Sequence, residues 1–223
     1  MDIFSRNIPT VSPEDQKILS TKTAFVAGCG GLGGFIIEYL VRLGVGHIIA
    51  CDADVFSESN LNRQILSTVG TLGKSKVREA EKRARSIVPD IRFDGFEVFL
   101  DEANACELMK GADIAMDALD NPSSRVILAK AAAETGIPMV HGAVGGQHLQ
   151  VSTVMPGEDY LIQMYTGAKK PDIQSTLSFV PPACAAMQVS EALKVLTGKE
   201  PSLKNRLLAG DLERFTFDII SFE

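Results

Sequence analysis

The chain has 223 residues, of which 45% are hydrophobic and 22% charged, so it contains enough apolar material for one large packed domain. Its 28 acidic side chains outnumber the 22 basic ones and give a formal net charge of −6, which argues against nucleic acid as a partner. Uncharged apolar runs stay shorter than the roughly 18 residues of a membrane span, and no apolar leader opens the chain. We therefore expect a cytoplasmic protein with no membrane partner.

Four cysteines are spread along the chain and form no CxxC pair. They are Cys29, Cys51, Cys106 and Cys184. This spacing predicts neither a disulfide framework nor a four-thiolate zinc site. A reducing compartment is the expectation that follows.

Helical and extended patterns alternate from the N-terminus onward. Residues 12–15 combine an N-cap serine, a proline and two acids, which predicts a helix to Leu19 within an N-terminal helical arm, residues 1–20. Residues 23–27 predict a strand, followed by a glycine turn, a helix to Leu43 and a strand at 47–51. The later elements expected are helices at 74–87, 102–109, 123–135 and 182–196, strands at 91–98, 112–117, 137–141 and 149–153, and a hairpin of 206–211 and 215–219.

This rhythm predicts an α/β fold with a Rossmann-like, doubly wound, mostly parallel sheet and antiparallel C-terminal strands, in a single domain spanning residues 1–223. Residues 157–178 are polar and show no clean period, so we expect a long, partly mobile loop there.

A glycine-rich turn and a carboxylate indicate a nucleotide site. Gly28, Gly30 and Gly33 follow a predicted strand and open a helix, where backbone N–H groups can meet a phosphate. Asp52 ends the next strand, 19 residues after Gly33, which is the position of a ribose-binding carboxylate. A purely structural glycine turn is the weaker alternative.

A polar cluster follows Asp52 and favours phosphate chemistry over hydride transfer. The segment 54–64 ends in SNLNRQ, for which a dehydrogenase has no evident need. Arg63 and Lys76 would place two cations near a nucleotide phosphate, as phosphoryl or nucleotidyl transfer requires. The alternative is that both are ordinary surface charges.

Another carboxylate follows a predicted strand, at the sheet edge where open α/β sheets bind ligands. Asp120, in the sequence DALDN, could hold Mg²⁺ on a triphosphate. An Asp-Asn turn or helix cap would have the same sequence.

Together these motifs resemble the ThiF/MoeB/HesA family, the prokaryotic relatives of ubiquitin-activating enzymes. The resemblance rests on GCGGLGG, on D-x-D followed by SNLNRQ, on GKSK, on D-x-x-DN with Arg125 after it, and on the FSRN start and AGDLERFTFDI ending. It implies ATP- and Mg²⁺-dependent adenylation of the C-terminal glycine of a small ubiquitin-like sulfur carrier ending in Gly-Gly. Thiamine, molybdopterin or a related sulfur-containing product would be the end point.

The resemblance also implies roles for individual residues. By position, Gly28, Gly30, Gly31 and Gly33 match the phosphate turn, Asp52 the ribose ligand, Asn60, Arg63, Gln64 and Lys76 the phosphate and adenine cluster, and Asp120 the Mg²⁺-linked acid. Asp54, in the same D-x-D motif as Asp52, is expected among the cofactor-binding residues. Arg6 matches an arginine that reaches the neighbouring subunit's site in family dimers, which implies a homodimer. The histidines are then free to be structural.

Two departures from the family pattern alter the expected chemistry. Many members bind zinc through two CxxC pairs, which this chain lacks, so zinc is not expected. The loop 157–178 has no cysteine, so we expect transfer to a separate sulfur donor and not a covalent carrier adduct. Cys184 lies just beyond that loop, and a buried core thiol is its preferred interpretation.

Two other functions remain open at this point. An NAD-dependent Rossmann oxidoreductase would use the same glycines and Asp52. An ATP-dependent tRNA-modifying dehydratase of the same superfamily is also conceivable, although the acidic charge balance disfavours it.

Overall fold

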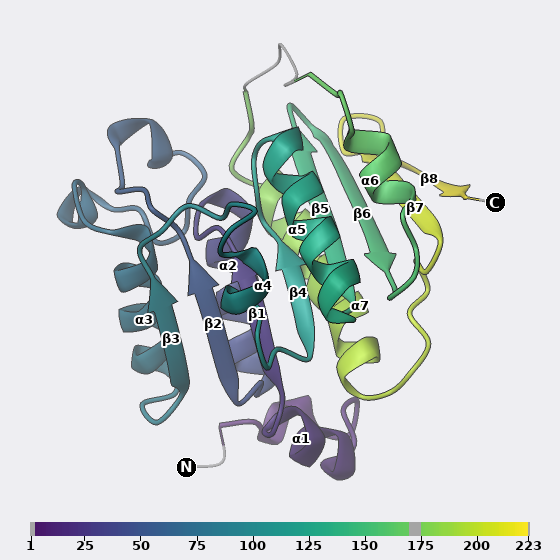
Figure 1. Ribbon diagram of the computed structural model, residues 1–223. Coiled ribbons are helices and arrows are strands. Elements are labelled where there is room, and N and C mark those ends of the chain that lie inside the picture. The colour runs from purple at the N-terminus through teal and green to yellow at the C-terminus, as the bar shows by residue number, and fades with distance from the viewer. Residues whose placement is uncertain (1–2, 170–174, 223) are drawn as a thin grey trace.

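The computed structural model describes residues 3–169 and 175–222 and contains one eight-stranded sheet with helices on both faces (Figure 1). The strands are β1 (Thr23–Ala27), β2 (His47–Cys51), β3 (Arg92–Phe96), β4 (Ile114–Asp117), β5 (Met139–Gly145), β6 (His148–Val154), β7 (Arg206–Asp211) and β8 (Thr216–Ser221). The helices are α1 (Pro13–Leu19), α2 (Gly31–Leu43), α3 (Lys76–Ile87), α4 (Ala105–Leu108), α5 (Pro122–Thr135), α6 (Tyr160–Tyr165) and α7 (Val180–Leu196).

The strand order is β3-β2-β1-β4-β5-β6-β7-β8. Strands β3 to β5 pair in parallel, whereas β5 to β8 pair antiparallel, beginning with Met139 opposite Val154. The predicted fold class is therefore confirmed. The order reverses between β1 and β4, and ligands of open α/β sheets bind at such a reversal.

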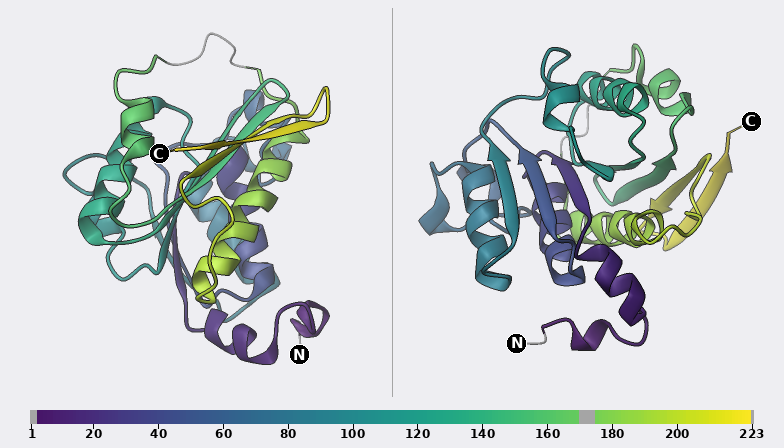
Figure 2. Two further views of the ribbon diagram at one scale, coloured as in Figure 1. Left: turned by 90° about the vertical axis from the view of Figure 1, so that its right-hand side faces the viewer. Right: turned by 60° about the horizontal axis from the view of Figure 1, so that its bottom comes forward.

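Alternate residues of the central strand enter two separate cores. Ala24 and Val26 pack with α2, α3 and α7, whereas Phe25 and Ala27 pack with α4, α5 and α6. Because successive strand side chains point to opposite faces, a strand buried on both sides is apolar throughout, as TAFVA is. Figure 2 shows the helices on the two sides of the twisted sheet.

Local signals begin the helices near the residues expected. Ser12 Oγ accepts the Asp15 N–H at 3.0 Å at the start of α1, and Ser75 Oγ accepts the Arg78 N–H at the start of α3. Asn121 Oδ1 accepts the Ser124 N–H at 2.8 Å, so the sequence DN before Pro122 does act as a helix cap. None of the helices in the described residues is long and apolar enough to cross a membrane.

The segment expected to be a loop contains a helix. Residues 160–165 form α6, with Tyr160 and Leu161 buried against the same core as α5. The prediction of irregular structure is thus wrong for these six residues, because apolar side chains at 160, 161, 164 and 165 form a short helical face. Residues 170–174 of that segment lie outside the described residues.

Candidate functional site

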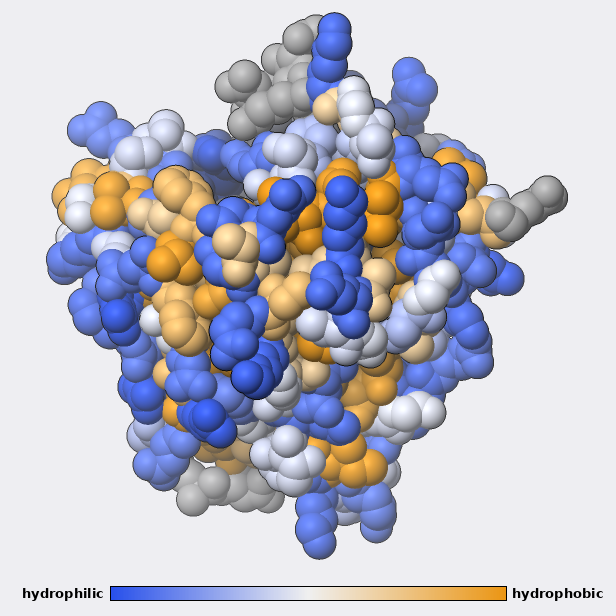
Figure 3. Space-filling model, viewed as in Figure 1, coloured by the Kyte–Doolittle hydropathy of each residue, from blue (hydrophilic) through white to orange (hydrophobic). Residues whose placement is uncertain are grey.

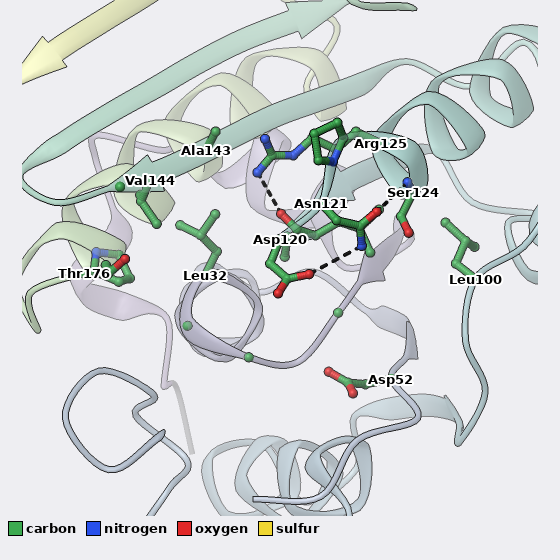
Figure 4. A pocket seen from close by; sticks show the side chains of 18 of the residues that line it. Leu32, Asp52, Leu100, Asp120, Asn121, Ser124, Arg125, Ala143, Val144 and Thr176 are labelled. Atoms are coloured by element: carbon green, nitrogen blue, oxygen red, sulfur yellow. Dashed lines mark hydrogen bonds between the residues drawn. The ribbon is translucent and has the colours of Figure 1, made fainter. Parts of the chain in front are cut away.

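A cavity of about 630 Å³ opens at the carboxyl ends of the parallel strands, where the strand order reverses. Its wall includes the glycine turn, residues 51–54, residues 118–122 after β4, and part of the β5–β6 hairpin. Figure 4 shows Asp52 and Asp120 projecting toward the space beside the glycine turn. The two carboxylates follow β2 and β4, the strands that pair with β1 on its two sides.

The glycine turn is shaped by close backbone contacts. Gly28 has φ +96°, a conformation that favours glycine. A Cβ on Gly33 would lie 1.8 Å from the Gly28 carbonyl oxygen, so this glycine allows the turn to close onto α2. Gly28, Gly30 and Gly31 line the cavity, whereas Gly33 is behind them and is not in its wall.

Asp52 is tied to the glycine turn. Its Oδ2 accepts the Cys29 N–H at 2.7 Å and its Oδ1 accepts the Asp54 N–H at 2.8 Å. Burial raises the pKa of Asp52, while these two backbone hydrogen bonds and nearby Lys76 oppose the rise. Each carboxylate oxygen has a second acceptor site, so Asp52 can still receive a hydroxyl group.

Lys76 and Asp54 form an ion pair at the cavity wall. Lys76 Nζ lies 2.8 Å from Asp54 Oδ2, and the lysine side chain is only 8% exposed. Lys76 is the first residue of α3, so its ammonium group and the helix N-terminus face the same space. The structure thus brings both predicted residues to the cavity.

Within the SNLNRQ cluster the structure separates cavity residues from structural ones. Arg63 lines the cavity and donates to the Ser59 carbonyl and Asn62 Oδ1. Gln64 lines it too, and its buried Oε1 has no hydrogen-bond partner. Asn60 does not reach the cavity wall, because its Oδ1 accepts the Ser57 N–H and closes the local turn.

On the other side of the cavity, Asp120 is exposed and Asp117 is fully buried. Asp117 Oδ1 accepts the Leu119 N–H at 3.0 Å, which turns the chain so that Asp120 reaches the cavity. Asp120 therefore occupies the predicted edge of the sheet. Arg125, one turn into α5, also lines the cavity.

A buried polar group behind Arg125 was not predicted from the sequence. It joins Asp117 and His141 to Tyr165, whose hydroxyl contacts Arg125 and approaches Gln150. The resemblance leaves the three histidines free to be structural, and His141 is a member of this buried group. Little in the sequence signals the contact with Tyr165, because α6 has only six residues and Tyr165 lies five positions after Tyr160, which is not the three- or four-residue spacing of one helix face.

Four helices begin at the cavity. Gly31 of α2, Lys76 of α3, Pro122 of α5 and Pro181 of α7 all lie in the first turn and line its wall. First-turn N–H groups have no acceptors within their helix and carry the positive end of the helix dipole. The cavity is therefore suited to an anionic ligand, although the whole chain carries a net charge of −6.

Arg6 lies away from the cavity of its own chain. It belongs to a 3-10 turn, Ser5–Asn7, and Asn7 donates to the Arg42 and Leu43 carbonyls at the C-terminal end of α2. The glycine turn is at the other end of this 13-residue helix, roughly 20 Å away at 1.5 Å per residue. The structure does not bring Arg6 together with the other predicted residues.

Among residues 3–169 and 175–222, no three His, Cys, Asp or Glu side chains group to hold a metal ion by themselves. Mg²⁺ in nucleotide sites needs only one or two carboxylates, because phosphates and waters supply its other ligands. Asp120 beside an anion-binding turn is compatible with that donor set.

The four cysteines are all free, and three of them are poor nucleophiles. Cys29, Cys51 and Cys184 are buried. Burial raises the pKa of Cys51 and of Cys184 to about 12 and that of Cys29 well above its usual range. Cys184 is thus a core thiol on α7, and its Sγ contacts the backbone carbonyls of Ala143 on β5 and Gln150 on β6.

Comparison with known proteins gives relatives along the whole chain. The "SAMP-activating enzyme E1" of Haloferax volcanii is 33% identical, over 100% of this chain and 85% of that protein. The "Sulfur carrier protein adenylyltransferase" of Thermus thermophilus is 32% identical over 94% of this chain and 82% of its own length. The "Sulfur carrier protein ThiS adenylyltransferase" of Bacillus subtilis is 36% identical over 85% of this chain, but only 59% of the relative is covered.

Solved structures share the fold. The crystal structure of E. coli MccB with ATP superposes with a TM-score of 0.85 at 20% identity, covering 99% of this chain and 70% of MccB. The sequence pattern of the ThiF family matches residues 4–223. The chain belongs to the ThiF family.

Proposed function

We propose that the protein uses ATP to adenylate the C-terminal carboxylate of a small ubiquitin-like sulfur carrier ending in Gly-Gly, for thiamine, molybdopterin or related sulfur-transfer biosynthesis. Its relatives include named sulfur carrier adenylyltransferases, and the chain is an adenylyltransferase of the ThiF type. The carrier, the pathway and the cytoplasmic location belong to the proposal.

One observation carries this proposal: a single cavity is lined by the glycine turn with two cations, and by a further cation and a carboxylate after β4. Arg63 and Lys76 lie near the turn, and Arg125 and Asp120 lie across from them. A nucleotide bound by the first group would present its α-phosphate to a carboxylate bound by the second. Hydride transfer gives no role to the Lys76 and Arg63 cations.

The reaction then needs positioning more than proton transfer. A peptide α-carboxylate has a pKa of about 3.3–3.7 and is already ionised at neutral pH. One of its oxygens attacks the α-phosphorus of ATP, the bond to the β-phosphate oxygen breaks, and acyl-adenylate and pyrophosphate form. Asp52 accepts ribose hydroxyls, while Lys76 and Arg63 stabilise the charge that moves onto pyrophosphate.

Asp120 is the residue that would hold Mg²⁺ together with the phosphates of ATP. Bound there, the ion would neutralise phosphate charge. Lys76 must exchange Asp54 for phosphate oxygens when ATP enters, so Asp54 keeps the ammonium group oriented before binding.

A homodimer would bring Arg6 of one chain to the cavity of the other. Arg6 is exposed and far from its own glycine turn, so it can serve a site only in a second copy. Exposed apolar side chains also gather on the segment between β2 and α3, visible at the upper left of Figure 3. They are Val55, Leu61, Ile65 and Val69, and such a patch is suited to burial against another chain.

The acyl-adenylate would pass to a separate sulfur donor. Cys184 is fully buried, and burial raises its pKa to about 12, so it is unsuited to capture the carrier. The carrier would remain noncovalently bound at the cavity.

ATP–pyrophosphate exchange tests the proposal. The chain should incorporate labelled pyrophosphate into ATP only when Mg²⁺ and a ThiS-type carrier with an intact Gly-Gly end are present. The same carrier without its last glycine is the matched control and should give no exchange. Tight NAD binding by calorimetry, with no carrier-dependent exchange, would instead support an oxidoreductase.

A further inference from the structure

A chain of four side chains runs from the buried core to the cavity wall. It consists of Asp117 on β4, His141 on β5, Tyr165 on α6 and Arg125 on α5. We propose that Tyr165, oriented by the His141–Asp117 pair, is a positioning residue that holds the Arg125 guanidinium for the carrier's carboxylate. The reactive role of Arg125 rests on the proposed function, whereas the positioning itself does not.

The contacts define which atom donates in each hydrogen bond among these four side chains. His141 Nδ1 lies 2.7 Å from Asp117 Oδ2, and a carboxylate only accepts, so Nδ1 carries the proton. His141 is fully buried, and that burial lowers its pKa, which keeps the ring neutral and leaves Nε2 as an acceptor. The Tyr165 hydroxyl has two possible acceptors, His141 Nε2 at 3.2 Å and Gln150 Oε1 at 3.4 Å, and donates to Nε2 as the nearer of the two.

Because the Tyr165 hydroxyl donates its only proton to His141, its lone pairs face Arg125. Arg125 Nη1 donates to that oxygen at 3.1 Å, and Nη2 donates to the Leu119 carbonyl at 2.8 Å. The guanidinium also lies over the Tyr165 ring, 5.1 Å from its centroid. These contacts fix both the plane and the position of the guanidinium.

Arg125 keeps donors for a ligand after these contacts. A guanidinium has five N–H donors, and the contacts above use one N–H of Nη1 and one of Nη2, which leaves a second N–H on each. The buried Nε faces Asp117 Oδ2 at 3.6 Å. Arg125 and Tyr165 both line the cavity, as does Gln150, whose Oε1 is 3.4 Å from the tyrosine hydroxyl. Figure 4 shows the Arg125 side chain on the same side of the cavity as Asp120 and Asn121.

Rigid placement of this guanidinium matters because a fixed cation lowers the barrier without reorganisation when charge moves at the carboxylate. Tyr165 is also the last residue of α6, so the contact joins the cavity wall to the C-terminal end of that helix. The same tyrosine thus orders both the arginine and the end of that helix.

The test compares Tyr165→Phe with Tyr160→Phe. Tyr160 lies on the same helix, and its buried hydroxyl bonds Ser152 and the Thr153 carbonyl, but it does not line the cavity. We expect Tyr165→Phe to lower kcat for carrier-dependent exchange by about tenfold or more, with KM for ATP unchanged. Tyr160→Phe should keep the wild-type kcat even if it lowers the melting temperature.

A double-mutant cycle shows whether Tyr165 acts through Arg125. Once Arg125→Lys has removed the guanidinium that Tyr165 orients, adding Tyr165→Phe should cause no further loss of activity. Additive losses in the cycle would overturn the inference, as would a wild-type kcat for Tyr165→Phe. His141→Gln, which removes the group that orients the hydroxyl, should fall between wild type and Tyr165→Phe.

A measurement without substrate separates this inference from the proposed function. The NMR signal of the Arg125 Nε–H, assigned by its loss in Arg125→Lys, should shift or broaden in Tyr165→Phe and stay in place in Tyr160→Phe. An unchanged signal in Tyr165→Phe refutes the positioning. If the Arg125 Nε–H signal shifts in Tyr165→Phe but the wild-type protein catalyses no carrier-dependent ATP–pyrophosphate exchange, the proposed carrier adenylation is refuted and the positioning of Arg125 is not.

Discussion

The carbonyl oxygen of Gly28 occupies the space that the first side-chain atom of any other residue at Gly33 would need. A Cβ built there lies 1.8 Å from that oxygen and 2.7 Å from the carbonyl carbon. The contact is backbone against helix, so no side chain can rotate to relieve it. The closed glycine turn therefore depends on a glycine that does not itself line the cavity.

Gly33→Ala should lower the free energy of unfolding by more than about 3 kcal/mol, because the turn must separate from α2. Urea denaturation measures this loss. Gly70→Ala is the control, since its Cβ would have no neighbour closer than 3.8 Å. Equal urea midpoints for the two variants would contradict the contact.

Asp120→Asn should lower carrier-dependent exchange by about a hundredfold, because it removes the charge proposed to hold the metal–phosphate complex. The loss should be greatest at limiting Mg²⁺. Asp90 is an exposed acid outside the cavity wall, so Asp90→Asn should retain activity. Both variants should have the melting temperature of the wild type. Wild-type rates for Asp120→Asn under limiting Mg²⁺ would remove this residue from the mechanism.

Arg6→Ala and Arg63→Ala should each be nearly inactive alone, and mixing them should restore part of the exchange activity. Restoration is expected because a heterodimer would contain one site with both arginines. Subunit exchange is verified by native mass spectrometry of a tagged and an untagged chain. Exchange of subunits with no gain in activity would exclude Arg6 from acting across an interface.

Iodoacetamide at pH 8 should label Cys106 before the other cysteines, since the other three are buried. Burial raises the pKa of Cys184 to about 12, so it should react only in denaturant. Cys184→Ala should keep at least about half of the exchange activity, as expected for a core thiol. Mass spectrometry that maps a carrier adduct to Cys184 would reverse this assignment.

His141 predicts a loss of stability on mild acidification. Its folded pKa is lowered by burial, so between that value and the unfolded pKa of about 6.5 the unfolded state binds more protons. The stabilisation from the neutral ring is complete above about pH 6.5 and is lost as the pH falls through that window. The urea midpoint should thus drop more between pH 7.5 and 5.5 in wild type than in His141→Gln.

His148→Gln is the matched control for replacing a histidine by glutamine, because His148 is exposed and makes no contact with Asp117 or Tyr165 in the hydrogen bonds of the described residues. Asp52 changes stability in the opposite sense, since burial raises its pKa, but it is present in all three proteins and cancels in the comparison. Equal pH dependence in wild type and His141→Gln would contradict the prediction, because it would mean that folding does not lower the pKa of His141.

The first half of the fold was predictable because its signals are local. TAFVA, the glycine turn and the strand ending before Asp52 follow one another within about one βαβ unit, and the structure reproduces these elements. Lys76 and Arg63 could be placed near the turn for the same reason. Their catalytic roles stay predictions.

The remaining site residues depend on contacts between distant segments. Asn60 looked like its neighbours Arg63 and Gln64, but only packing reveals that it closes its own turn. Tyr165 reaches His141 and Arg125 through a short helix whose apolar face is too brief to distinguish from a loop. Hydrophobic periodicity gives little signal for helices this short.

The position of β1 at the centre of the sheet affects how the chain can fold during synthesis. The Thr23 N–H at its start donates to Asp113, 90 residues later, and its second neighbouring strand follows at Ile114. At 5–20 residues per second, a ribosome takes about 5 to 18 seconds to make that stretch. One edge of β1 stays unpaired for that time, so the nascent N-terminal half exposes a strand edge that a chaperone bound there would protect from aggregation.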